Sequence, residues 1–286
     1  MAGRYQDIDA ETRAALTLKR SELMGRLGAR VTVFSSNEEL IAAFADRILA
    51  DYQNCLDAGR EEVAMIVPVG PVGQYSVLAS KCLKDRISLN RLTLFVMDEY
   101  LTDEGSWIPK SDPLSFRAHI RRCLIDALPE ELRPALVVPN PTDPTAVRRE
   151  VERLGGIDVT NAGVGINGHL AFNEPIVGVT SPEFFADLPT RVVPLLPETR
   201  LINSVTAARG NVARIPRMAV TVGMREILKA RLLRIYLNRP WQSAVIRLLA
   251  CGPVTASFPA SLVQKHPNWS LFVVDYVLEE PEPELA

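Results

Sequence analysis

Short apolar runs alternate with amphipathic stretches along most of this chain. Residues 63–68 and 92–97 are almost continuously apolar, which is the pattern of strands buried on both faces of a sheet. The segments that follow them carry polar caps and one-sided apolar positions typical of helices. This alternation predicts an α/β fold with a single doubly wound, mostly parallel sheet and helices on both faces. Further β-prone runs occupy residues 31–34, 136–138, 157–162, 232–237 and 271–275.

The chain divides into one large unit and two short flanks. No internal repeat or low-complexity segment interrupts residues 31–276, so these residues are predicted to form one Rossmann-like α/β domain. Residues 1–30 are charged and show helical periodicity, which predicts an N-terminal helical extension. Residues 277–286 are acidic and rich in proline, which predicts a disordered tail.

The composition argues against several classes of function. A net charge of -2 over 286 residues offers no basic face for nucleic acid. No run of about eighteen apolar residues exists, so we expect no membrane span, and the N-terminus lacks the apolar core of a signal peptide. We therefore expect a cytoplasmic protein whose four scattered cysteines are reduced. Three histidines are too few for a histidine-rich site, so no metal is expected.

Residues 163–175 concentrate side chains suited to chemistry. This stretch contains three glycines, His169 and Glu174, and it follows the β-prone run at 157–162. Glycine permits positive φ angles and a close approach to a ligand. Ligands of open α/β sheets bind at the carboxyl ends of the strands, so a histidine and a carboxylate displayed there suggest acid–base catalysis.

Two other interpretations of this loop stay open. Its glycines match the G-x-G-x-x-G spacing of a dinucleotide-binding fingerprint, but Pro175 interrupts the helix that this motif requires. The acidic residue at the expected distance, Asp187, follows no predicted strand, so a nucleotide site is disfavoured. Alternatively, the loop is a plain turn whose histidine caps a helix or pairs with a buried group. The neighbouring Asn167 and Glu174 weaken this interpretation without removing it.

A second candidate lies at the end of the apolar run at 92–97. Asp98 directly follows this predicted strand, where a parallel sheet binds its ligands. Position alone leaves two roles for Asp98, which are capping the next segment and acting on a substrate.

A resemblance to a known family rests on several motifs. Residues 163–175, Gly-Val-Gly-Ile-Asn-Gly-His-Leu-Ala-Phe-Asn-Glu-Pro, resemble the signature loop of the glucosamine-6-phosphate deaminase/isomerase family. The related 6-phosphogluconolactonases share the Gly-His core but usually continue with Ser-Leu-Phe-Pro. Met-Asp-Glu-Tyr at 97–100 and Glu-Thr-Arg-Leu-Ile-Asn at 198–203 resemble further deaminase motifs, as do blocks at 215–224 and 252–267. These motifs occur in the family's order, and the resemblance covers roughly residues 32–276.

The resemblance implies an acid–base set and a substrate-binding set. Asp98 would take the C2 proton of an opened sugar, and His169, supported by Glu174 and Asn167, would move the proton that opens the ring. No metal or organic cofactor is implied, because the carbonyl group itself acidifies the C2–H bond. The residues placed for substrate binding are Gly70, Gly73, Glu99, Gly165, Gly168, Arg200 and Trp241.

The family's phosphate anchor is altered in this chain. The corresponding turn at 69–75 has glycines but no hydroxyl group before Tyr75, and Pro71 lacks an N–H donor. Val205 falls where the family carries an arginine, and Trp241 falls where it carries a lysine. Trp241 either stacks on a sugar face or packs in the core. Four arginines could supply the missing cations from shifted positions: Arg209, Arg214, Arg217 and Arg239.

The sequence therefore predicts a cytoplasmic sugar or amino-sugar isomerase/deaminase that forms a homo-oligomer, as family members often do. Its substrate would be a small-molecule sugar or sugar phosphate, and the altered anchor suggests a non-phosphorylated or differently substituted sugar. One alternative is a sugar lactonase like the 6-phosphogluconolactonases, against which the Phe-Asn-Glu-Pro ending argues. Another is a non-catalytic sugar-binding sensor, which the complete acid–base set disfavours and the altered anchor keeps open.

Overall fold

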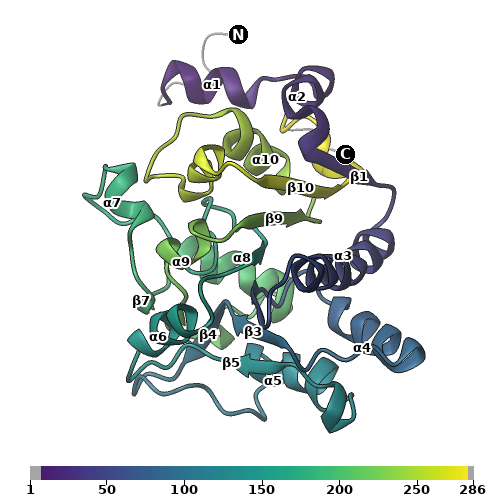
Figure 1. The fold of residues 1–286 in the computed structure, drawn as a ribbon. Helices are drawn as coiled ribbons and strands as arrows, with labels where there is room; N and C mark the ends of the chain where they lie inside the picture. Colours follow the sequence, from purple (N-terminus) through teal and green to yellow (C-terminus); the bar gives the residue numbers. More distant parts are fainter. Residues whose placement is uncertain (1–7, 283–286) are drawn as a thin grey trace.

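The computed structural model describes residues 8–282. Two β-sheets form the centre of this part of the molecule (Figure 1). Within these residues the larger sheet has seven strands in the order β1-β10-β9-β6-β2-β3-β5, and all neighbouring strands are parallel. The predicted doubly wound parallel sheet is therefore confirmed. Its strands are β1 (Val31–Phe34), β2 (Val63–Val67), β3 (Leu92–Val96), β5 (Ala135–Val137), β6 (Val159–Ala162), β9 (Leu232–Leu237) and β10 (Trp269–Val274).

The smaller sheet was not predicted from the sequence. It contains β4 (Asp98–Leu101), β7 (Arg191–Pro194) and β8 (Met218–Thr221), and β8 pairs antiparallel with both neighbours. Only Met97 separates β3 from β4, so the chain leaves the parallel sheet and enters the smaller one at Asp98. This transfer places Asp98 between the two sheets.

Helices cover both faces of the parallel sheet, and the alternation of side chains along its strands shows how. Val63, Met65 and Val67 of β2 pack with α3, α4 and the segment after α5, whereas Ala64 and Ile66 pack with α2, α6, α9 and α10 on the other face. The helices are α1 (Ala10–Leu16), α2 (Arg20–Leu27), α3 (Asn37–Asp57), α4 (Gln74–Asp85), α5 (Phe116–Ile120), α6 (Thr145–Arg153), α7 (Pro182–Ala186), α8 (Pro197–Ala207), α9 (Met224–Leu228) and α10 (Gln242–Cys251).

The two ends of the described chain pack together over α10. Helices α1 and α2 contact α10, and the C-terminal end lies close to α2 in the same part of the molecule (Figure 1). Arg247 of α10 is completely buried and donates hydrogen bonds to the backbone carbonyl groups of Leu18, Leu278 and Glu279. The described part of residues 1–30 thus contains α1, α2 and a short 3-10 helix at Gly28–Arg30, and residues 1–7 lie outside the described residues.

The packed chain extends past residue 276, where the disordered tail was predicted to begin. Val277 and Leu278 are completely buried in a short 3-10 helix, Asp275–Leu278, because both are apolar and face the core beside α10. Acidic composition therefore misplaced this boundary by a few residues. Residues 283–286 lie outside the described residues.

Candidate active site

A cavity of about 270 Å³ opens at the carboxyl ends of adjacent strands of the parallel sheet. Strands β9, β6, β2 and β3 are consecutive in the sheet, and each is followed by a segment that lines the cavity. Helix α8 adds Ile202, Asn203 and Thr206 to the wall. The cavity therefore occupies the place where open parallel sheets bind their ligands.

His169 lines this cavity and is held by a chain of hydrogen bonds. Its Nδ1 lies 2.7 Å from Asn167 Oδ1, and Asn167 Nδ2 donates to Glu174 Oε1 over 3.0 Å. The amide oxygen can only accept, so Nδ1 carries the hydrogen and Nε2 keeps its lone pair. The two carboxylate oxygens of Glu174 also accept from the Thr199 hydroxyl group and from the Leu196 N–H. Glu174 therefore orients His169 through Asn167, because its own oxygen is 4.0 Å from Nδ1.

Burial keeps this histidine neutral. The side chain of His169 is about one tenth exposed, and the loss of hydration lowers its pKa from 6.5 to about 4, against the opposing effect of the Glu174 charge. A neutral imidazole with a free Nε2 can accept a proton. None of the described residues forms a hydrogen bond with Nε2, because the contacts to Asn167 and Thr199 both involve Nδ1.

Two glycines shape the loop that carries His169. A Cβ atom on Gly165 would lie 2.1 Å from His169 Nε2, so the imidazole ring can lie against the backbone only where residue 165 is glycine. Gly168 has a φ of 80°, and a Cβ there would meet the Phe258 ring at 2.6 Å. Gly165 lines the cavity. Gly168 does not line it, and its positive φ angle allows the chain to turn just before His169.

Asp98 is the buried carboxyl group of the cavity. It is 8% exposed, and burial together with the neighbouring Glu99 charge raises its pKa from 3.8 to about 8. Asp98 and Tyr100 line the cavity because side chains two apart on a strand share a face.

Glu99, which was predicted to bind substrate, points to the opposite face of β4. It is completely buried and does not line the cavity. Its carboxylate accepts from the Ser115 hydroxyl group, from two backbone N–H groups at the start of α5, and from Arg117 Nη1 at 2.9 Å. These contacts occupy both oxygens, so Glu99 ties α5 to the smaller sheet instead of contacting a ligand.

The remaining predicted binding residues are divided. Gly70 and Trp241 line the cavity, but Gly73 and Arg200 do not. Gly73 has a φ of 122° and caps α4, where an added Cβ would press against Ile41. Arg200 reaches the backbone carbonyl group of Ile215.

Among the four arginines considered as substitute anchors, Arg239 lines the cavity and the other three do not. Arg214 forms an ion pair with Asp112, and Arg209 and Arg217 are exposed. The guanidinium group of Arg239 has no carboxylate partner within the described residues. Val205 is 62% exposed and contributes nothing to the cavity.

Sequence reasoning missed Tyr100, Asn203 and Thr199. Asn203 Nδ2 donates to the Tyr100 hydroxyl oxygen over 2.9 Å, and both residues line the cavity. Thr199 supports Glu174 as described above. All three belong to the motifs at 97–100 and 198–203. In a strand that starts at Asp98, side chains two residues apart share a face, so this pattern would have indicated that Tyr100 faces the same cavity as Asp98.

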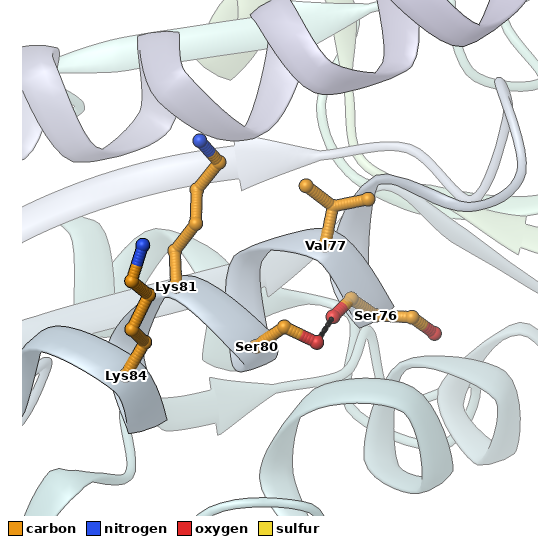
Figure 2. A pocket seen from close by; sticks show the side chains of 5 residues that line it. All are labelled: Ser76, Val77, Ser80, Lys81 and Lys84. Atoms are coloured by element: carbon orange, nitrogen blue, oxygen red, sulfur yellow. Dashed lines mark hydrogen bonds between the residues drawn. The ribbon is translucent and has the colours of Figure 1, made fainter.

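A separate hollow lies on the surface of α4, lined by Ser76, Val77, Ser80, Lys81 and Lys84 (Figure 2). The Ser80 hydroxyl group donates to the Ser76 carbonyl group, and Lys81 pairs with Asp46. The five side chains drawn in Figure 2 all come from α4, and none of the predicted catalytic residues line this hollow. It therefore offers no chemistry comparable to that of the cavity at the strand ends.

Within residues 8–282, no group of three or more His, Cys, Asp and Glu side chains is arranged to hold a metal ion. In the same residues, no helix has the length and apolar character needed to span a bilayer.

Curated relatives share most of the chain. A glucosamine-6-phosphate deaminase from Corynebacterium aurimucosum is 30% identical over 250 residues, which cover 85% of this chain and 90% of that protein. The chain belongs to the glucosamine-6-phosphate deaminase family. A glucosamine-6-phosphate deaminase from Porphyromonas gingivalis is 28% identical over 255 residues, covering 86% of this chain and 91% of the relative. No family model matches.

Solved structures show the same fold. A monomeric glucosamine-6-phosphate deaminase superposes with a TM-score of 0.70 and 24% identity, covering 87% of this chain and 98% of the other. A 6-phosphogluconolactonase from Trypanosoma cruzi has a TM-score of 0.63 and 16% identity, covering 87% and 95%. A deaminase and a lactonase therefore both share their architecture with this chain, so the fold does not decide between the two activities and the side chains of the cavity must do so.

Proposed function

We propose that this member of the glucosamine-6-phosphate deaminase family is an amino-sugar isomerase/deaminase that opens the sugar ring and then removes the C2 proton. The observation that carries the proposal is one cavity lined by two complementary proton-transfer groups. His169 offers an unpartnered imidazole nitrogen, and Asp98 offers a carboxyl group whose pKa is raised to about 8. A general base is most effective when its pKa is close to the working pH.

The first step is ring opening. His169 Nε2 takes the proton of the C1 hydroxyl group, the C1–O5 bond breaks as the C1 carbonyl group forms, and the proton passes to O5. The short-lived imidazolium is stabilised by Glu174 through Asn167, which also keeps the ring in the correct orientation.

The second step is proton abstraction at C2. Asp98 takes the C2 proton, the electron pair of this bond forms a C1=C2 bond, and the carbonyl pair moves to O1. The proton returns to C1, one amino proton moves to O1, and a C2=N imine remains. Water hydrolyses the imine to a ketose and ammonia. The electron demand is met by the substrate carbonyl group, so the scheme needs no cofactor.

Two loops correspond in position to the family's phosphate anchor but lack its groups, which favours a substrate without a phosphate dianion. Val69, Val72 and Trp241 present apolar surface, and Pro71 has no N–H to donate. Arg239 is the sole arginine or lysine among the described residues of this cavity wall. Hydrogen bonds to charged groups contribute about 1.5–3 kcal/mol each, so losing several would weaken dianion binding strongly. The proposed substrate therefore lacks the phosphate or carries a smaller group at this end.

The test compares glucosamine, glucosamine-6-phosphate and a sugar lactone, following ammonia, ketose and acid release. Ammonia and ketose from the unphosphorylated sugar, with at least about a 10³-fold loss in Asp98→Asn and His169→Ala, are expected. Turnover of the phosphate alone would overturn the substrate assignment but leave the chemistry intact. Turnover of the lactone alone would establish the lactonase alternative, and binding without turnover would establish the sensor. Homo-oligomer formation and a cytoplasmic location stay predictions, tested by light scattering and fractionation.

A further inference from the structure

A buried tyrosine faces the cavity with its hydroxyl hydrogen unused. Tyr100 lies two residues after Asp98 on β4, and both side chains line the cavity. The Tyr100 side chain is 2% exposed, and its oxygen accepts a hydrogen bond of 2.9 Å from Asn203 Nδ2. Within the described part of the chain, no group accepts a hydrogen bond from this hydroxyl.

The chemistry of the two groups sets the direction of this hydrogen bond. An amide nitrogen can only donate, so the phenol oxygen is the acceptor and its own hydrogen points elsewhere. Burial raises the pKa of Tyr100 above its ordinary value, so the hydroxyl group stays protonated. Buried polar groups are nearly always hydrogen-bonded, and the cavity is the open side of this residue. A bound molecule in the cavity would therefore supply the missing acceptor.

We propose that Tyr100 is a catalytic residue that donates a hydrogen bond to the C1 oxygen of the opened sugar, and that Asn203 is a positioning residue that orients the phenol. The inference rests on the proposed function, because this oxygen becomes negatively charged as Asp98 takes the C2 proton. Residues two apart on a strand are separated by about 7 Å, so both side chains can reach neighbouring atoms of one substrate. Tyr100 keeps its proton throughout, and no bond to it is made or broken.

The surroundings of Tyr100 suit a fixed donor. Its ring packs against Phe116 and Phe172, with centroid distances of 4.8 Å and 5.5 Å. A donor held before the reaction begins stabilises developing charge without having to reorganise. Removing one such donor typically lowers kcat by about 10²–10³-fold.

The first variant is Tyr100→Phe, which keeps the ring contacts and removes the hydroxyl group. We expect kcat to fall by about 10²–10³-fold while KM changes less than about threefold, since the hydrogen bond strengthens as the transition state forms. Tyr52→Phe is the matched control, because Tyr52 is a buried tyrosine of α3 that does not line the cavity. A change in KM with unaltered kcat would show that Tyr100 binds a ground-state hydroxyl group, and it would overturn the proposal.

Two substitutions of Asn203 separate positioning from packing. In Asn203→Asp the carboxylate accepts the phenol hydrogen and withdraws it from the substrate, so kcat should fall about as far as in Tyr100→Phe. In Asn203→Ala the phenol remains free to donate, so the loss should stay below about tenfold. A purely structural role predicts the reverse order, because alanine leaves the larger gap.

The double variant Tyr100→Phe/Asn203→Asp completes the cycle. It should be no slower than Tyr100→Phe alone, because both substitutions remove the same hydrogen bond. Additive losses would overturn the positioning role of Asn203. If the wild type is active and Tyr100→Phe is equally active, the whole inference is overturned, but the proposed function still stands. Absence of turnover by the wild type would overturn both.

Discussion

Replacing Asp98 by asparagine should stabilise the fold by an amount that grows with pH. Burial and the neighbouring Glu99 raise the pKa of Asp98 from 3.8 to about 8. Between these two values the folded protein holds a proton on Asp98 that the unfolded chain has released. The unfolded state then binds fewer protons, so Asp98 makes the free energy of unfolding decrease as the pH rises through this window. Asparagine carries no charge in either state and is free of this cost.

The size of the effect follows from the width of that window. One pKa unit corresponds to about 1.4 kcal/mol, and Asp98 is only 8% exposed, so solvent screens the effect little. The advantage of Asp98→Asn over the wild type should therefore increase by on the order of 4 kcal/mol between about pH 5 and pH 8. Above about pH 8 the folded protein is also ionised, and the difference should become constant.

Urea denaturation of both proteins at several pH values between about 5 and 9 measures this difference directly. Asp103→Asn is the matched control, because Asp103 is an exposed aspartate. The wild-type kcat/KM should rise with pH towards about 8, as the base form of Asp98 becomes populated, and Asp98→Asn should lower turnover by at least about 10³-fold. A pH-independent stability difference would refute the reasoning, since it would mean that Asp98 is ionised in the folded protein at acidic pH.

Two further substitutions test how the site is held. Gly165→Ala places a Cβ atom 2.1 Å from His169 Nε2 and should lower kcat/KM by about 100-fold or more. The control is Gly163→Ala, whose added Cβ meets nothing closer than 3.9 Å. Equal losses in the two variants would contradict the steric argument. Arg117→Met leaves the Glu99 carboxylate buried without its cation and should lower the urea-derived free energy of unfolding by about 3–5 kcal/mol, whereas adding Glu99→Gln should recover part of that loss. An additive double variant would show that the two side chains do not act as a pair.

The central strands could be located from local sequence because burial on both faces requires an unbroken apolar run. Such runs at 63–68 and 92–97 correspond to β2 and β3, and the loop at 163–175 does follow a strand. The glycines, His169 and Asp98 were recognisable for a related reason. Residue types at a strand's carboxyl end are limited by what a ligand and a tight turn require.

The smaller sheet could not be predicted in this way. Its strands begin at residues 98, 191 and 218, and no local pattern indicates that they pair. Antiparallel pairing between distant segments is decided by which side chains pack together once the chain is folded. The single residue between β3 and β4 also concealed the change of sheet, so Asp98 was predicted to follow a strand of the parallel sheet and not to begin a strand of another sheet.

The sequence by itself determined the family, the order of the central elements, and the residue types available for proton transfer. The tertiary structure alone decided which of those residues meet. Glu99 and Tyr100 are adjacent in one motif, yet Glu99 pairs with Arg117 away from the cavity while Tyr100 faces it beside Asn203. The reason is geometric: a strand sends neighbouring side chains to opposite faces, and their partners come from distant parts of the chain.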